Sequence, residues 1–496
     1  MTTGEKIASI LGSIDDFVWG KPLIIFVTLV GLYFLIRGKF FPFAHFGHIF
    51  KNTVFAKASE SGKADSGKVS PYRAFCIALG GAVGMGNISG VASAIAVGGP
   101  GALFWMWIVA FFGMMVKLVE ITLGVYYRRK DANGKMQGTT MGYIERGIKG
   151  EMGQKWGGPL AMIFCVFLFI MFVQGSGTYT VAETLHASFG WNIMVVAVIY
   201  VAFVLYLIIR GENAIGRFAE KAVPIMCGLF LLGTLVILGI NYKNIPAMFA
   251  SIFKGAFTGT AAVGGFIGST VSQAVQKGVA RSIYSNEAGY GTAPMFHGGA
   301  DTVHPVRQGL WGSVEVFCDT LIVCTCVGLA IIVTNTWESG LTGATLGVAA
   351  FSASFGNFGK WFLGVMTILF AFTTSTAWYL LYQSLIGYMF KKNAKAAKVA
   401  HKVFSVLFPL TMIGTCALIY FTGNDAGLFW TIVSITTGLP EFFNCIAILC
   451  LNKKFFALFK DYKARYMGIG TVDPDFKIFA EDDEEVMTKI HANGVE

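Results

Sequence analysis

The sequence predicts an all-α polytopic membrane protein with eleven transmembrane spans, and three observations support this fold class. Of the 496 residues, 55% are hydrophobic and only 13% are charged, whereas soluble proteins carry about 25% charged residues. Apolar runs of roughly 20 residues, the length that crosses a bilayer, recur along the chain. The lysines and arginines lie mostly in the loops between these runs, as the positive-inside rule expects. The net charge of +10 therefore indicates cytoplasmic loops, and we expect no nucleic-acid partner.

The first span is expected at Val18–Ile36, after a short polar segment. The loop that follows, up to Arg73, is strongly basic and contains only Glu60 and Asp65 as acidic residues. A basic loop is expected in the cytoplasm, which places the N-terminus outside. The N-terminus also lacks the features of a cleaved signal peptide. Residues 1–70 thus form an N-terminal segment with a span of its own.

Ten further spans are expected in a core over residues 71–452. They are Tyr72–Val97, Ala102–Tyr127, Pro159–Ala187, Trp191–Ile209, Ala219–Ile240, Gly259–Val275, Gln308–Thr334, Trp361–Phe390, Val399–Phe421 and Gly427–Leu451. The loops that this count places inside are basic or mixed, and those that it places outside carry no lysine or arginine except Asn241–Thr258. That segment is expected to form an external amphipathic helix, and residues 453–496 a cytoplasmic tail.

The ten spans divide into two repeats of five, at about 71–240 and 258–452. Because each repeat has an odd number of spans, the second is inverted relative to the first. Glycines interrupt the opening span of each repeat: Gly80, Gly81, Gly84, Gly86 and Gly90 in the first, and Gly264, Gly265 and Gly268 in the second. Glycine costs a helix interior about 1 kcal/mol relative to alanine, so each span is either broken at a site or closely packed against a neighbour. Interrupted spans at corresponding positions of two repeats favour the substrate site of a secondary transporter.

Side chains that carry oxygen accompany the first break, Gly81–Asn87. This break ends in the Asn87 amide, and Thr373, Thr374 and Ser375 stand in a row in the middle of a later span. Unwound carbonyls and hydroxyls suit a small hard cation such as Na+, and the N-terminus of a half-helix suits a carboxylate. The alternative for the three hydroxyl groups is hydrogen bonding between helices.

Three further residues are candidates for a pocket. Gln174 is an uncharged polar residue deep in a span, and it reaches either the polar end of a substrate or a neighbouring backbone. The rings of Phe266 and Trp378 either wall a small pocket or belong to ordinary packing.

Several ionisable residues fall inside predicted spans. Glu315 and Asp319 are four residues apart, hence on one helical face, and Asp319 lies well inside its span. An intramembrane carboxylate is a functional hypothesis by default, and here it is an ion ligand, a proton carrier or a structural acceptor. Lys117 and Glu120 either pair with each other or extend towards the membrane surface.

The segment Arg281–Pro294 is polar and rich in glycine, and we expect it to be a cytoplasmic loop that serves as an inner gate or as a compact turn. It lacks the pattern of a phosphate loop. The histidines His186, His297, His304 and His401 stand in no catalytic cluster of the sequence, and the nine cysteines have no metal-binding spacing. The sequence therefore does not predict an enzyme.

Two motifs carry a resemblance to a known family. The stretch Asn87–Trp107, which contains NISGVASA and GGPGALFWMW, and the stretch Ser285–Pro294, SNEAGYGTAP, closely resemble the alanine or glycine:cation symporter family. The resemblance runs from the first span to the last. It implies sodium-driven uptake of small neutral amino acids across a prokaryotic inner membrane, with no organic cofactor. It also implies a fold similar to that of the leucine transporter, preceded by one extra helix, and it is compatible with a monomer.

The resemblance to that wider fold implies a sodium site. Its ligands are the backbone carbonyls of Gly80 and Val83 together with Ala371, Thr374 and Ser375. The fold's other sodium site uses an amide that matches Asn87, but its threonine falls on Ala261. We therefore expect one required sodium ion.

The resemblance also implies a place for the substrate. Its carboxylate is expected near Met85–Ser89, and the substrate site comprises Met85, Gly86, Asn87, Ser89, Gln174, Phe266, Thr373 and Trp378. The leading hypothesis is sodium-coupled uptake of alanine or glycine by alternating access. Proton coupling through Asp319 is the second hypothesis.

Overall fold

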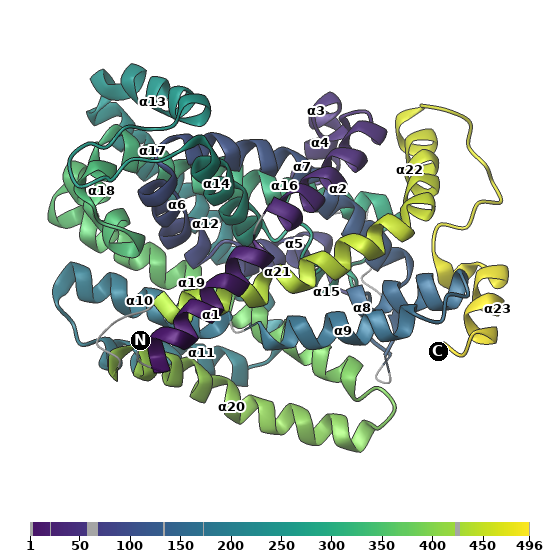
Figure 1. Ribbon diagram of the computed structural model, residues 1–496. Coiled ribbons are helices and arrows are strands. Elements are labelled where there is room, and N and C mark those ends of the chain that lie inside the picture. Colours follow the sequence, from purple (N-terminus) through teal and green to yellow (C-terminus); the bar gives the residue numbers. More distant parts are fainter. Residues whose placement is uncertain are drawn as a thin grey trace.

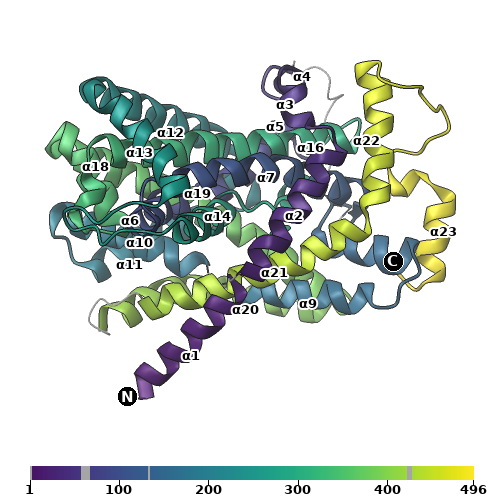
Figure 2. The same cartoon turned by 45° about the horizontal axis from the view of Figure 1, so that its top comes forward.

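The computed structural model describes the backbone of residues 3–19, 21–56, 68–131, 134–171, 173–421 and 427–495. These residues are almost entirely helical, and the sheet among them is a short antiparallel pair, β1 (Arg129–Lys130) and β2 (Met136–Gln137). Figures 1 and 2 show the helices gathered in one bundle with the C-terminal helices at its side. Within the described residues, seven helices are long and apolar enough to cross a membrane, or eight when the bent pair Pro71–Ala82 and Gly86–Gly98 counts as one span. The chain is therefore a polytopic helical membrane protein, as predicted.

The helices follow the chain in four groups. Those before residue 71 are α1 (Thr3–Val18), α2 (Lys21–Arg37), α3 (Phe41–Ala44) and α4 (Phe46–Asn52). Up to residue 240 they are α5 (Pro71–Ala82), the π-helical turn η2 (Gly86–Gly90), α6 (Val91–Gly98), α7 (Gly101–Tyr126), α8 (Thr140–Tyr143), η3 (Ile144–Glu151), α9 (Gly157–Ile170), α10 (Val173–Phe189), α11 (Ile193–Ile209) and α12 (Glu212–Ile240). Up to residue 450 they are η4 (Tyr242–Asn244), α13 (Ile245–Thr258), α14 (Val271–Asn286), α15 (Ala293–His297), α16 (Pro305–Val316), the π-helical η5 (Phe317–Cys324), α17 (Thr325–Val333), η6 (Thr336–Ser339), α18 (Gly343–Phe355), α19 (Asn357–Met389), α20 (Ala394–Phe421) and α21 (Gly427–Cys450). The tail contains α22 (Asn452–Met467), η7 (Ala480–Asp482) and α23 (Glu484–Ala492).

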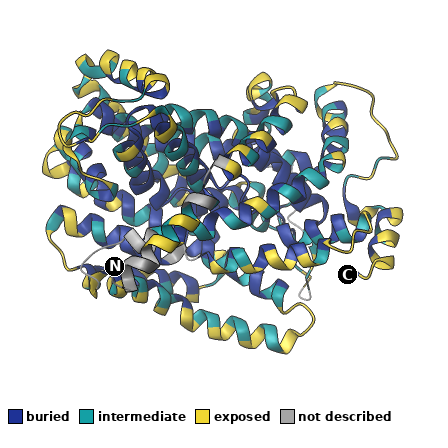
Figure 3. Ribbon diagram, in the orientation of Figure 1, coloured by how far each residue is buried: buried dark blue, intermediate teal, exposed yellow. Residues whose placement is uncertain are grey.

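Most predicted spans coincide with a helix or with two consecutive helices. α9 and α10 cover the predicted span Pro159–Ala187, and α16, η5 and α17 cover Gln308–Thr334. Helices α2 and α11 are apolar but shorter than the other spans. Figure 3 shows buried residues concentrated in the central helices and exposed faces on the outer ones. Those outer faces carry apolar side chains such as Phe203, Leu232 and Leu410, as a surface in contact with lipid requires.

The predicted span Gly259–Val275 is wrong, because most of it is a loop. Two isolated antiparallel bridges, Thr260 with Ser269 and Val263 with Phe266, fold residues 260–269 back on themselves. Gly259, Gly264 and Gly268 have φ angles of 74°, 55° and 89°, a left-handed conformation that glycine adopts at little cost. The apolar glycine run therefore forms turns, and the helix starts only at Val271, behind a capping box of Thr270 and Gln273.

The expected cytoplasmic loop after that span is also wrong. Residues 271–286 form α14, which packs against α6 and α7, and residues 293–297 form α15, which packs against α5 and α7. Every residue of Ser285–Pro294 is buried. We refer to α14 and α15, which residues 287–292 separate, as the second broken helix of the chain, and this motif lies inside the bundle.

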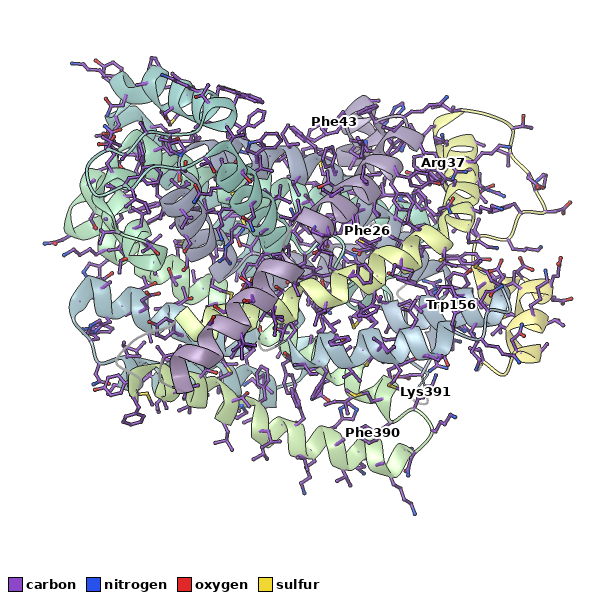
Figure 4. All side chains as sticks on the ribbon, viewed as in Figure 1. Phe26, Arg37, Phe43, Trp156, Phe390 and Lys391 are labelled. Carbon is purple, nitrogen blue, oxygen red and sulfur yellow. The ribbon has the colours of Figure 1, made fainter. Side chains whose placement is uncertain are left out.

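The two ends of the chain pack onto the bundle. The N-terminal helix α2 contacts α7 and α21, and its Phe26 ring lies 5.4 Å from the ring of Phe442. Arg37, labelled with Phe26 in Figure 4, donates to Asn452 Oδ1 at 2.6 Å. In the tail, Phe479 belongs to a small buried cluster with Ala293 of α15. The tail thus contacts α15.

Candidate functional site

The first broken helix has its break inside the bundle. α5 ends at Ala82, η2 begins at Gly86, and the two segments meet at 48°. All residues from Ala74 to Ala92 are buried, so the backbone groups freed by the break need partners from the protein. The Asn87 side chain supplies one, because its Oδ1 accepts a 2.8 Å hydrogen bond from the Gly84 N–H. The predicted break at Gly81–Asn87 is confirmed.

Helix α19 meets this break through the Thr374 hydroxyl. The hydroxyl oxygen lies 3.1 Å from the Gly80 carbonyl oxygen and 3.3 Å from that of Val83. A Cβ atom on Gly84 would lie 2.5 Å from Thr374 Oγ1, so glycine permits the close approach. Two backbone oxygens and one hydroxyl therefore converge, and Ala371 lies one turn earlier on α19, also buried.

The other two hydroxyls of the predicted row face different partners. The Ser375 hydroxyl lies 2.9 Å from the Tyr200 hydroxyl of α11. The Thr373 hydroxyl donates within its own helix, to the Phe370 carbonyl at 2.9 Å. The structure thus brings Thr374 directly to the carbonyls of the break, while Ser375 lies beside it and Thr373 contributes to the helix.

Asn87 also connects the first break to a buried carboxylate. Its Nδ2 donates to Asp319 Oδ1 at 2.7 Å. The hydroxyls of Ser285 and Thr320 donate to Asp319 Oδ2 at 2.8 and 2.7 Å. The second broken helix therefore faces Asn87 with Ser285, and not with Ala261, which lies in the exposed part of the 259–270 loop. The Asp319 carboxylate thus accepts three side-chain hydrogen bonds.

The second break carries a buried acidic residue that the sequence reasoning missed. Glu287 follows α14 with φ at 54°, a left-handed conformation that is uncommon outside glycine. The Thr292 hydroxyl donates to its Oε2 at 2.5 Å. The signal in the sequence is an acidic residue inside a glycine-rich motif, but the polarity of this motif favours a cytoplasmic loop.

A small cavity lies where these elements meet. Its lining residues come from both broken helices, from α19 and from the residue that follows α9: Gly81, Ala82, Met85, Gly86, Met171, Tyr284, Glu287 and Thr374. The centre of a water-sized sphere can move through about 10 Å³ of it, which is room for about one water molecule. The side chains are therefore closed around the cavity in this conformation.

Further buried charged residues lie on the helices around the cavity. The Lys117 ammonium forms an ion pair with Glu315 Oε2 at 2.7 Å and donates to the Asn286 carbonyl at 2.8 Å. Glu315 also pairs with His297. Of the two alternatives for Lys117, neither holds, because its partner is Glu315 and not Glu120. Glu120 instead accepts from the Gly291 N–H at 3.2 Å.

Of the eight predicted substrate residues, Met85 and Gly86 line this cavity, and the other six do not line it or have side chains outside the described residues: Asn87, Ser89, Gln174, Phe266, Thr373 and Trp378. Phe266 lies in the 259–270 loop with its ring 5.2 Å from that of Trp337, because the helix predicted to carry it does not form. Trp378 is fully buried on α19 and packs 6.0 Å from the Tyr382 ring. Ser89 is buried in η2. The side chain of Gln174 lies outside the described residues.

Comparison with known proteins gives a consistent set of matches. The model of the sodium:alanine symporter family matches residues 4–476. An uncharacterised transporter of Haemophilus influenzae is 36% identical, covering 95% of this chain and 99% of that protein. A putative sodium/proton-dependent alanine carrier protein of Bacillus subtilis, YrbD, is 33% identical over 92% of both chains. The crystal structure of MhsT in complex with L-phenylalanine is 12% identical with a TM-score of 0.55, covering 87% of this chain and 96% of that one. At that identity the likeness concerns the leucine-transporter-like fold alone.

The contact between Asn87 and Asp319 makes a prediction about stability. Asn87→Ala leaves the Gly84 N–H and one oxygen of Asp319 without partners in a buried place, which costs about 1–3 kcal/mol or more for a charged group. Asn241→Ala is the matched control, because the Asn241 amide is only half-buried and bonds to neutral partners, Ile237 and Ser354. Thermal unfolding of the purified protein in detergent should show a larger drop for Asn87→Ala. Equal drops would contradict the importance of this contact.

Proposed function

Because the chain belongs to the sodium:alanine symporter family, we propose that it takes up alanine, glycine or a similarly small neutral amino acid together with sodium, by alternating access. The chain is a membrane transporter and not an enzyme. The observation that carries the sodium part is the convergence of the Thr374 hydroxyl on the carbonyls of Gly80 and Val83. Oxygen ligands of this kind, at a helix break inside the bundle, suit Na+.

We further propose eleven spans, with the N-terminus outside and the C-terminus in the cytoplasm. The proposed number of spans stays at eleven, because the span predicted at Gly259–Val275 is replaced by α14–α15 as the opening span of the second repeat. The broken pairs α5–α6 and α14–α15 then occupy corresponding positions in two inverted repeats, as the sequence reasoning required. Localisation in an inner membrane and action as a monomer belong to the same proposal.

The substrate is proposed to lie at the cavity between the two breaks. Met85 and Gly86 line it, and the helix η2–α6 starts there, so its amide N–H groups and the positive end of its dipole favour a carboxylate. Because the cavity has room for about one water molecule in this conformation, the lining side chains must move apart for any amino acid to bind, and a small side chain requires the least movement. The participation of Ser89, Gln174, Thr373 and Trp378 stays a prediction.

Uptake by proteoliposomes tests the proposed function directly. The purified protein should accumulate labelled alanine when sodium is higher outside than inside, and the accumulation should vanish when potassium replaces sodium. Unlabelled glycine and serine, added in a competition panel, should reduce the signal more than larger amino acids. Alanine uptake that is indifferent to sodium would remove sodium coupling from the proposal.

The sodium site makes a sharper prediction on α19. Thr374→Ala combined with Ser375→Ala should raise the sodium concentration for half-maximal uptake about tenfold or more, since a polar ligand of a charged group contributes about 1.5–3 kcal/mol. Thr376→Ala is the matched control, because the Thr376 hydroxyl donates to carbonyls of its own helix, Phe372 and Thr373. The control should leave the sodium titration unchanged. If the double variant also leaves it unchanged, these residues do not bind sodium.

Proton coupling through Asp319 is the alternative function, and one observation favours it. Asp319 is a fully buried carboxylate in direct contact with the first break through Asn87, as a proton carrier linked to helix movement would be. This alternative predicts that an imposed pH gradient drives alanine uptake in sodium-free buffer, and that Asp319→Asn abolishes this uptake. The same measurement on the wild type decides the matter, because a wild type that shows no uptake without sodium excludes the proton as sole coupling ion.

A further inference from the structure

Glu287 occupies a special position in the second break. It is 5% exposed and lines the cavity together with Met85 and Gly86 of the first break. Its backbone is left-handed, with φ at 54°. Residues other than glycine persist in such conformations only where the surroundings fix them, and they cluster at functional sites. The structure therefore fixes a carboxylate at the wall of the cavity.

The Glu287 carboxylate has one oxygen available. Oε2 accepts the hydrogen bond from the Thr292 hydroxyl at 2.5 Å. Within the described residues, Oε1 has no hydrogen-bond partner, and part of its surface is accessible. A ligand in the cavity can therefore reach Oε1 directly.

The charges around Glu287 do not balance. Lys117 acts electrostatically on Glu287, Glu315 and Asp319, but its ammonium is committed to Glu315 at 2.7 Å and to the Asn286 carbonyl. His297 also pairs with Glu315. Of the described residues, four buried carboxylates (Glu120, Glu287, Glu315 and Asp319) thus lie within electrostatic reach of one lysine, whose ammonium binds Glu315. A buried charge without a partner is costly, so Glu287 favours a cation from the cavity.

We propose that Glu287 binds the ammonium group of the amino-acid substrate, an inference that rests on the proposed function. The cavity then has two poles of opposite charge. The start of η2–α6 at Met85 and Gly86 receives the carboxylate, and Glu287 receives the ammonium group, whose three N–H donors suit a carboxylate acceptor. Sodium needs several oxygen ligands, and those converge at Gly80, Val83 and Thr374 instead.

Glu287 is thereby a specificity-determining residue for the α-amino group. A substrate analogue with a hydroxyl group in place of the ammonium group leaves the Glu287 charge buried and unpaired. A site built to pair with a polar group of its substrate rejects the analogue that lacks it. Wild-type protein should therefore bind L-alanine much more tightly than L-lactate, which differs in that one group.

Binding to purified protein in sodium tests the proposal. Labelled alanine is bound to the wild type and to Glu287→Gln, and unlabelled L-alanine and L-lactate compete for the site. In Glu287→Gln the alanine dissociation constant should rise roughly ten- to hundredfold, as for the loss of a hydrogen bond between charged groups. The lactate constant should stay the same or fall, so the preference for alanine collapses.

Two controls keep this test decisive. Glu338→Gln removes a carboxylate from η6, away from the cavity-lining residues, and should leave both constants unchanged. If Glu287→Gln weakens alanine and lactate by the same factor, Glu287 has only a structural role and the proposal is overturned. If the variant does not fold, the wild type decides, because equal binding of alanine and lactate overturns the proposal.

Failure of this inference is distinguishable from failure of the proposed function. A wild type that binds alanine in a sodium-dependent manner but does not discriminate against lactate retains the proposed function and loses the role of Glu287. A wild type that shows no sodium-dependent alanine binding loses both.

Discussion

The structure depends on satisfying polar backbone at two helix breaks where no bulk water is available. Asn87 connects the first break to the buried carboxylate. Its side-chain oxygen accepts a hydrogen bond from the Gly84 N–H of its own break, and its side-chain nitrogen donates one to Asp319. Ser285 of the second broken helix donates to the same carboxylate. The two broken helices are therefore linked through one buried carboxylate, and the cavity is lined by residues from both of them.

Glycine is what allows these elements to approach. A side chain at Gly84 would collide with Thr374, and one at Gly86 would lie 3.0 Å from the Tyr284 ring. The glycines cost helix stability, but they expose the carbonyls of Gly80 and Val83 to a facing hydroxyl. The same glycines thus weaken the helix and bring its carbonyls to the Thr374 hydroxyl, so a glycine cluster in an apolar span indicates the site in the sequence.

The first break was predictable and the second was not, for a physical reason. In the first, apolar flanks surround the glycines, so hydropathy locates both the span and its break. In the second, α14 contains Lys277 and Arg281 and is not apolar enough to be recognised as a span. Some of its polar side chains have partners inside the bundle; the Ser282 hydroxyl, for example, donates to the Met106 carbonyl. Hydropathy therefore favoured the apolar loop before α14, which misplaced Phe266 and Ala261 and hid Glu287.

The proposed coupling between sodium and the amino acid follows from Thr374, which belongs to both proposed sites. Thr374 lines the cavity and also contacts the carbonyls of Gly80 and Val83. Under the proposed function, an ion bound there would draw α5 towards α19, and Gly81 between those carbonyls is itself a cavity residue. The proposed ion would thus change the shape and the electrostatic potential of the proposed amino-acid site. By linkage, an amino acid that prefers this arrangement strengthens ion binding to the same extent, so coupling needs no long-range pathway.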